Sequence, residues 1–350
     1  MQSDVIVNKA IVVDLYRSIL GRSPESEEVI VEHASKGSVE RIARDLLSSP
    51  EYIARQTYSF TNHDLIGGGE ILARHSKKDR SFRPGYITNF MGVDTDIRYC
   101  GWTTERVEDD MPVPGNFHAS AVEWAAALRA VDLSRDSFTV IELGAGWGCW
   151  MVNTAYAAKR LGRTVLALGV EGDESHVSWI KSHGAINGLT ENEVRIDRSV
   201  AWGKNGFAIF PRSEDSANSY GQEPRYFPTE TEARTFASVE PDAFDVLEAK
   251  TLETIAAGLD RVDLLHVDIQ GGEAALVRES LDFLGDKVAY IVVGTHGRDI
   301  EGDLIMTLRN RGWILEIEEP CTLPLPLHGG GTPYADGLQG WRNPQLLPLE

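Results

Sequence analysis

The sequence predicts an α/β fold, a doubly wound and mostly parallel sheet preceded by a small all-helical domain. From residue 119 onward, apolar runs alternate with helical patterns, which is typical of a parallel sheet covered on both faces. The first apolar run ends in a glycine-rich turn, whereas the first sixty residues show only helical spacing. We therefore expect a small helical domain (1–60), a linker or lid region (61–118) and the α/β domain (119–350).

The first sixty residues contain two segments with helical spacing of apolar side chains, residues 9–20 and 38–56, and Ser38 is a suitable N-cap for the second. The stretches "LYRSILGRSPESEE" and "LLSSPEYI" resemble a small bacterial helical domain of unassigned function that is often attached to cell-envelope and sugar-modifying proteins. Residues 61–118 are rich in Gly, Pro, Asp and Asn and show no sustained period.

The α/β region supplies its elements in a regular order, with short apolar runs as strands and longer amphipathic stretches as helices. The expected strands are 138–143, 164–170, 262–269, 288–294 and 313–318. The expected helices are 120–131, 150–162, 175–186, 272–285 and 301–312. Residues 205–242 break this rhythm and predict an irregular insertion near the ligand crevice.

Composition limits the partners that the chain can have. The 350 residues include 53 acidic and 34 basic side chains, a formal net charge of −19, and no dense basic cluster. Nucleic acids and anionic membranes are therefore poor partners. No apolar run approaches the roughly 18 residues of a membrane span, and no signal peptide is apparent, so we expect a soluble cytoplasmic protein. The three cysteines lack C-x-x-C spacing and predict reduced thiols.

The turn "ELGAGWG" follows the first strand, where a doubly wound sheet places its ligand crevice. Its G-x-G-x-G spacing differs from the G-x-G-x-x-G of dinucleotide enzymes, whose pyrophosphate rests on a helix N-terminus. S-adenosylmethionine has no phosphate and carries cationic groups, so an acid beside the glycines fits it better. The predicted cofactor-binding residues of this turn are Glu142, Gly144, Ala145, Gly146, Trp147 and Gly148.

The second strand ends in "LGVEGD", which places Glu171 where a carboxylate can accept hydrogen bonds from both ribose hydroxyls. Gly172 and Asp173 complete this half of the predicted cofactor site. Each feature alone also fits a tight turn or a solvated strand-end acid. Together they favour S-adenosylmethionine, with NAD as the main rival.

The later stretch "VDLLHVDIQGGEAALV" carries a family resemblance. With "TLETI", "SVAWGKNG", "RGW" and "DGLQGWRNP", it resembles the FkbM family of S-adenosylmethionine-dependent methyltransferases, over roughly residues 115 to 346. Asp263, Asp268, Gly271 and Glu273 match the acids and glycine of the family motif. Many members carry Lys and Glu where this chain has His266 and Gln270, so no role is transferred to those two positions. The resemblance implies a class I methyltransferase fold, and transfer of a methyl group to a hydroxyl of a sugar, glycan or related small molecule.

Methylation of a hydroxyl needs a group that removes or orients its proton. Asp268, at the crevice end of its strand, is the first catalytic candidate, and His296 in "GTHG", after the next strand, is the second. The alternative for Asp268 is an acid that only stabilises a helix N-terminus, and the alternative for His296 is a loop histidine without a function. His266 is interpreted as a core histidine, and His118 and Trp147 as packing residues that can also line the pocket. The sequence indicates no dense metal-ligand cluster, so no metal is predicted.

Three function classes remain at this point. An active O-methyltransferase leads. An NAD-dependent oxidoreductase is disfavoured by the glycine spacing, and a non-catalytic binding module is motivated by His266 and Gln270. The expected partner is a small-molecule or glycan acceptor, and the sequence defines no oligomeric state.

Overall fold

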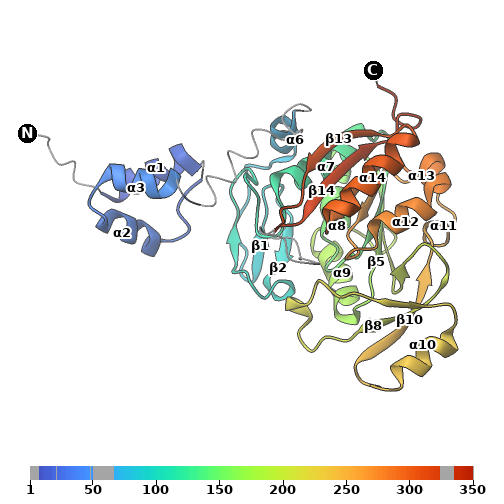
Figure 1. Cartoon of the computed structure of the whole chain (residues 1–350). Helices are drawn as coiled ribbons and strands as arrows, with labels where there is room; N and C mark the ends of the chain where they lie inside the picture. The colour runs from blue at the N-terminus through green and yellow to red at the C-terminus, as the bar shows by residue number, and fades with distance from the viewer. Residues whose placement is uncertain (1–7, 21, 48, 50–66, 324–334, 350) are drawn as a thin grey trace, which may run out of the picture.

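The computed structural model describes residues 8–20, 22–47, 49, 67–323 and 335–349 (Figure 1). Near the N-terminus lie α1 (Lys9–Leu20), α2 (Glu27–Ser35) and α3 (Val39–Leu47). Ser38 caps α3 through Arg41 N, as predicted, and the expected helix 38–56 is described only as far as Leu47. The three helices enclose a small core of their own, made by Val12, Tyr16, Leu20, Ile42 and Leu46.

A seven-stranded sheet forms the centre of the large domain, in the order β13-β14-β12-β11-β4-β5-β6. Its strands are β4 (Ser137–Leu143), β5 (Thr164–Val170), β6 (Val194–Asp197), β11 (Leu264–Val267), β12 (Tyr290–Thr295), β13 (Ile314–Glu319) and β14 (Gly337–Arg342). All neighbours are parallel except β14, which runs antiparallel to β12 and β13. The predicted doubly wound, mostly parallel α/β fold is therefore confirmed.

Alternate side chains of each strand enter two separate cores, because successive residues of a strand point to opposite faces. On β4, Val140 packs with helices α7 (Ala121–Leu133), α8 (Cys149–Arg160) and α9 (Glu174–Ile186). Its neighbour Ile141 packs on the other face. There the helices are α11 (Leu252–Ile255), α12 (Glu273–Glu279), α13 (Leu281–Lys287) and α14 (Arg298–Asn310). Figure 1 shows these helices covering both sides of the sheet.

The structure corrects the sequence-based prediction in three places. The helix predicted over 272–285 is two helices, which meet at Ser280. The strands β6 and β14 were not predicted; β14 contains two glycines and a glutamine, which weakens its apolar signal. The segment predicted as irregular contains β8 (Gly206–Pro211), the short helix η2 (Ser216–Asn218), β9 (Arg225–Phe227) and α10 (Glu230–Ala237).

This inserted segment builds a second sheet in the order β7-β10-β8-β9. Its other members are β7 (Val200–Ala201) and β10 (Phe244–Lys250). The segment's alternating aromatic residues, such as Phe207 and Phe227, pack against α10, which explains why a polar-looking stretch becomes ordered. The connection from η2 to β9 then runs past the ligand cavity, as predicted for this segment.

Residues 68–118 contain more regular structure than a linker needs. They form α6 (Gly68–His75), the short helix η1 (Ile97–Tyr99) and a small sheet in the order β2-β1-β3. Its strands are β1 (Tyr86–Thr88), β2 (Asp94–Asp96) and β3 (Arg106–Val107). The chain then lines the ligand cavity with residues 117–120 and begins α7 at a Ser120 N-cap. Within the described ranges, no helix is long and apolar enough to cross a membrane.

Candidate active site

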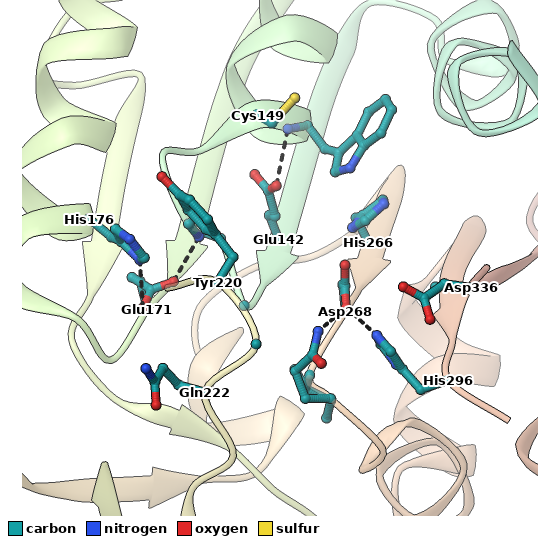
Figure 2. A pocket seen from close by; sticks show the side chains of 18 of the residues that line it. Glu142, Cys149, Glu171, His176, Tyr220, Gln222, His266, Asp268, His296 and Asp336 are labelled. Atoms are coloured by element: carbon teal, nitrogen blue, oxygen red, sulfur yellow. Dashed lines mark hydrogen bonds and ion pairs between the residues drawn. The ribbon is translucent and has the colours of Figure 1, made fainter. Parts of the chain in front are cut away.

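A cavity of about 760 Å³ opens where β4, β5, β11 and β12 end (Figure 2). The carboxyl ends of parallel strands are where doubly wound sheets bind ligands, and the volume lies within the usual range for small-molecule sites. Of the predicted residues, both catalytic candidates and most of the cofactor candidates line the cavity. The lining predicted residues are Glu142, Gly144, Ala145, Gly146, Trp147, Glu171, Gly172, Asp268 and His296.

The glycine turn lies against the end of β11. Gly144 and Gly146 have φ values of 73° and 53°, which side chains rarely adopt. A Cβ on Gly144 would also run into the main-chain oxygen of Asp268. The glycine at 144 is therefore required by close packing of two loops, and the turn holds the cofactor and acceptor candidates together.

Glu142 is fully committed to the backbone of α8. Its two carboxylate oxygens accept hydrogen bonds from Trp150 N (3.1 Å) and Met151 N (2.8 Å), which are unpaired donors in the first turn of that helix. Burial raises the pKa of Glu142 to about 8. The residue thus fixes the glycine turn to α8, in addition to lining the cavity.

Glu171 holds the other side of the turn. It accepts from Gly146 N (2.7 Å) and Asp173 N (2.8 Å), and His176 Nδ1 lies 3.7 Å from its Oε1. Asp173 itself caps α9 through Ser175 N and does not line the cavity. Gly148 is also absent from the lining; Ile180 packs above it. Asp173 and Gly148 therefore support the structure around the cavity and do not line it.

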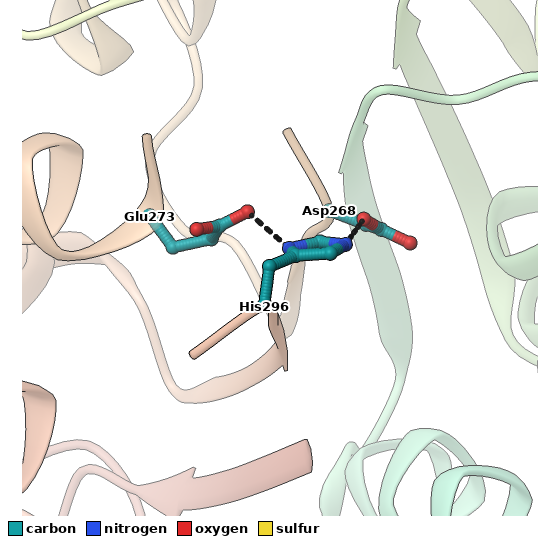
Figure 3. A group of neighbouring side chains, drawn as sticks. All are labelled: Asp268, Glu273 and His296. Atoms are coloured by element: carbon teal, nitrogen blue, oxygen red, sulfur yellow. Dashed lines mark hydrogen bonds and ion pairs between the residues drawn. The ribbon is translucent and has the colours of Figure 1, made fainter. Parts of the chain in front are cut away.

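Asp268 and His296 come together on the opposite side of the cavity, together with Glu273 (Figure 3). His296 Nδ1 lies 3.0 Å from Glu273 Oε1, and His296 Nε2 lies 3.4 Å from Asp268 Oδ1. Glu273 is fully buried at the start of α12, where Ile269 N and Gly271 N donate to the same Oε1. The side chain of Asp268 is 42% exposed within the cavity.

The charges of this cluster decide its protonation. Burial alone would lower the pKa of His296, but the Glu273 hydrogen bond and the Asp268 charge outweigh it and raise the pKa to about 9. Burial raises the pKa of Asp268, against the opposing charge of His296. For Glu273, burial is outweighed by the His296 and Gly271 hydrogen bonds, so its pKa is lowered. At neutral pH His296 is therefore an imidazolium between two carboxylates.

Ligand atoms of Asp268, Glu273 and His296 all lie within 4.8 Å of one another, a grouping that is able to hold a metal ion. The sequence did not indicate this cluster, because the three residues come from a strand end, a helix start and the next strand end. A metal on His296 Nε2 would replace the proton that this nitrogen presents to Asp268.

His266 lies deeper in the site. It is 1% exposed, stacks on Trp150 with ring centroids 5.1 Å apart, and its Nε2 lies 3.2 Å from Glu123 Oε1. Burial lowers the pKa of His266 to about 4, so the ring is neutral. Its burial agrees with the expectation of a satisfied core histidine, but the ring is not satisfied: Nδ1 has no hydrogen-bond partner among the described residues, and the ring reaches the cavity.

Aromatic rings form much of the remaining wall. Tyr220 faces Gly146, stacks on His176 at 4.5 Å and meets Trp147 edge-on at 5.0 Å. Trp147 Nε1 has no partner within the described part of the chain. The lining residues that sequence reasoning missed include Trp102, Glu123, Tyr220, Gln222, Glu319 and Asp336. Asp336 had a sequence signal, since it opens the "DGLQGWRNP" stretch, and Tyr220 and Gln222 lie in the segment predicted to be near the crevice.

Comparison with known proteins identifies the family. No protein-family model matches the chain. A protein of Jannaschia sp. (strain CCS1) named "Putative methyltransferase" is 36% identical over 271 residues, which cover 75% of this chain and 94% of that protein.

Two solved structures are more distant. The ribosomal protein L11 methylase of Lactobacillus delbrueckii subsp. bulgaricus has 12% identity and a TM-score of 0.34, covering 69% of this chain and 90% of its own. A human methyltransferase 10 domain containing protein has 12% identity and a TM-score of 0.35, covering 68% and 88%. The Jannaschia relative establishes the family, because the match covers almost its whole length. This chain belongs to the methyltransferase family and has the α/β class I methyltransferase-like fold.

Proposed function

We propose that the chain is an S-adenosylmethionine-dependent O-methyltransferase of the FkbM type, which methylates a hydroxyl of a sugar, glycan or related small molecule. The observation that carries the proposal is the meeting of two separate groups in one cavity: the glycine turn with Glu171, and the Asp268–His296 pair. The first suits a nucleoside and the second suits a hydroxyl proton.

The residues around the glycine turn fit the proposed cofactor. Glu171 uses one lone pair on each oxygen for backbone N–H groups, so further lone pairs remain for ribose hydroxyls. Trp147 and Tyr220 offer ring faces and edges for a heterocycle, and Trp147 Nε1 is an unused donor among the described residues. When bound, S-adenosylmethionine supplies an electrophilic methyl group on a sulfonium sulfur.

The Asp268–His296 pair receives the proton of the acceptor hydroxyl. Asp268 is exposed to the cavity and accepts hydrogen bonds only, so it orients the hydroxyl and draws its proton. His296 stabilises the Asp268 carboxylate by its positive charge at neutral pH, and Glu273 holds the imidazole from behind through Nδ1. Glu273 is therefore a positioning residue.

Two other interpretations of the sequence lose support. An NAD-dependent oxidoreductase does not fit a chain of the methyltransferase family. A binding module without catalysis is disfavoured because Asp268, His296 and Glu273 are held in contact within the cavity. His266 and Gln270 do not disrupt this contact; Gln270 donates to Asp268 Oδ1 at 3.3 Å.

The test of this proposal combines binding and turnover. Calorimetric titration should detect S-adenosylhomocysteine and not NAD, and a panel of sugars and glycans should include one that converts S-adenosylmethionine to S-adenosylhomocysteine. The second product must carry a new methyl ether. Binding of NAD in preference would overturn the cofactor, and N-methylated or C-methylated products would overturn the O-methyl assignment.

A further inference from the structure

The ionisable lining of the cavity is mostly acidic, and His296 is the imidazolium within it. The lining acids are Glu123, Glu142, Glu171, Asp268, Glu319 and Asp336. Burial raises the pKa of Glu123 and of Glu142 to about 8, so the negative charge at neutral pH comes from the other four. Among the described residues that line the cavity there is no Lys or Arg. Such a cavity favours positively charged ligands and repels anions.

The acids are concentrated on the acceptor side. Glu142 and Glu171 are engaged with backbone N–H groups of the cofactor side. Figure 2 shows Asp336 facing Asp268 and His296, and the Asp336 charge helps to raise the pKa of Glu123, after burial, to about 8. Glu319 joins them from the end of β13, where Ser120 Oγ donates to its Oε2 at 2.7 Å. His296 is the cation that the described lining places among these acids.

An independent observation also points to a ligand here. His266 is 1% exposed, lines the cavity and leaves its Nδ1 without a partner among the described residues. An unpaired polar atom at such depth is unfavourable unless a ligand or water satisfies it. Since ionised carboxylates only accept hydrogen bonds, a ligand that brings several donors fits this wall best.

We propose that the acceptor carries an ammonium group near the hydroxyl that is methylated, and so belongs to the amino sugars or other amino alcohols. An ammonium brings three donors and a positive charge to Asp268, Glu319 and Asp336, whereas a phosphate, carboxylate or sulfate group meets like charge there. This inference rests on the proposed function for the methyl transfer, but the charge preference of the cavity is measurable without turnover.

The experiment compares three probes that share one ring: D-glucosamine, D-glucose and D-glucuronate. Their dissociation constants are measured with the full-length protein saturated with S-adenosylhomocysteine, at low ionic strength, by calorimetry and ligand-observed NMR. We expect glucosamine to bind roughly tenfold more tightly than glucose, as hydrogen bonds to a charged group allow, and glucuronate to bind most weakly. Added salt should narrow these differences.

Matched variants locate the preference. Asp336→Asn and Glu319→Gln should each reduce the glucosamine-to-glucose ratio severalfold and improve glucuronate binding. Asp303→Asn is the control, because Asp303 is exposed on α14, pairs with Arg278 at 2.7 Å and lies outside the cavity lining. It should leave the ratio unchanged.

The outcomes separate this inference from the proposed function. Equal or tighter binding of glucose or glucuronate, or an Asp303→Asn effect as large as that of Asp336→Asn, overturns the ammonium assignment. If S-adenosylhomocysteine fails to bind, the proposed cofactor is wrong, and the probe series without it still tests the cavity charge. A metal ion is an alternative source of positive charge on the acceptor side. Stoichiometric Mn²⁺ binding to chelator-treated protein that is lost in His296→Ala would overturn the ammonium assignment in favour of a metal site.

Discussion

The two sides of the cavity hold their carboxylates in different ways. On the cofactor side, Glu142 and Glu171 bond to four backbone N–H groups of the turns and helix that surround them. On the acceptor side, Asp268 contacts the side chains of His296 and Gln270 and remains exposed to the cavity. Hydrogen bonds from backbone N–H groups hold Glu142 and Glu171 in one position. The charge of Asp268, which has side-chain partners, can instead respond to protonation and to a bound ligand. We therefore expect changes on the first side to affect binding and changes on the second to affect turnover and pH dependence.

The largest expected effect is on the acceptor side. Asp268→Asn keeps the size of the side chain but removes its charge, so cofactor affinity should persist while methyl transfer falls about 10²- to 10⁴-fold. The measurement pairs calorimetric titration of S-adenosylhomocysteine with initial rates on a true acceptor. Asp303→Asn serves as the control for a lost surface carboxylate. Unchanged turnover would reduce Asp268 to a structural partner of His296 and Gln270 and leave His296 as the base candidate.

The next effect concerns pH. If neutral His296 takes the proton, turnover should rise up to about pH 9, the value to which the pKa of His296 is raised. If Asp268 takes it, turnover should reach its plateau at lower pH and fall as His296 loses its positive charge. Because the Asp268 charge helps to raise the pKa of His296, the midpoint of the profile should move to lower pH in Asp268→Asn. A midpoint that is the same in both proteins would contradict the coupling of the two residues.

Protonation of His296 should also appear in stability. Its folded-state pKa of about 9 lies above its unfolded value, so the stabilisation is fully present below about pH 6.5 and is lost as pH rises through 9. The stability difference between the parent and His296→Gln should therefore shrink by a few kcal/mol at most between these limits, since each pKa unit is worth about 1.4 kcal/mol. Urea unfolding at both pH values measures it. A difference independent of pH would mean that the imidazole is held in its neutral form.

The cofactor side gives a smaller and different effect. Glu171→Gln should weaken S-adenosylhomocysteine binding by about 1.5–3 kcal/mol, the usual contribution of hydrogen bonds to a charged group. Glu174→Gln, three residues later and exposed, is the matched control. If Glu171→Gln binds S-adenosylhomocysteine as tightly as the parent does, Glu171 does not bind the ribose hydroxyls. A loss of turnover without a loss of affinity would contradict the division of the cavity into two sides.

The central fold was largely predictable because its signals are local. Each buried parallel strand is a continuous apolar run, and each glycine or acid at a strand end is placed by topology in the crevice. The strand β14 was missed because it depends on non-local pairing: "GLQGWR" has little strand character until it lies between β12 and β13. The second sheet was not predicted for the same reason, because β8 pairs with β10 across more than thirty residues of chain.

The site divides along the same line. Glu142 lies near the end of β4, Glu171, Asp268 and His296 directly follow strands, and all four were found from sequence. Glu123 and Tyr220 instead reach the cavity from a helix and from the inserted segment. No local pattern marks those positions. The sequence also did not predict which side chains each of these residues contacts. For example, the imidazole of His296 lies between Asp268 and Glu273.

The smallest expected effect comes from removing the N-terminal helices. Deletion of residues 1–60 should leave affinity for S-adenosylhomocysteine nearly unchanged, because every described residue that lines the cavity lies at or beyond Trp102. The helices α1 to α3 also have their own apolar core, which is typical of a unit that folds separately. Calorimetry on the shortened and full-length proteins makes the comparison, and circular dichroism confirms that the α/β domain remains folded. If the shortened protein is soluble and folded but does not bind S-adenosylhomocysteine, part of the cofactor site must lie in the N-terminal segment.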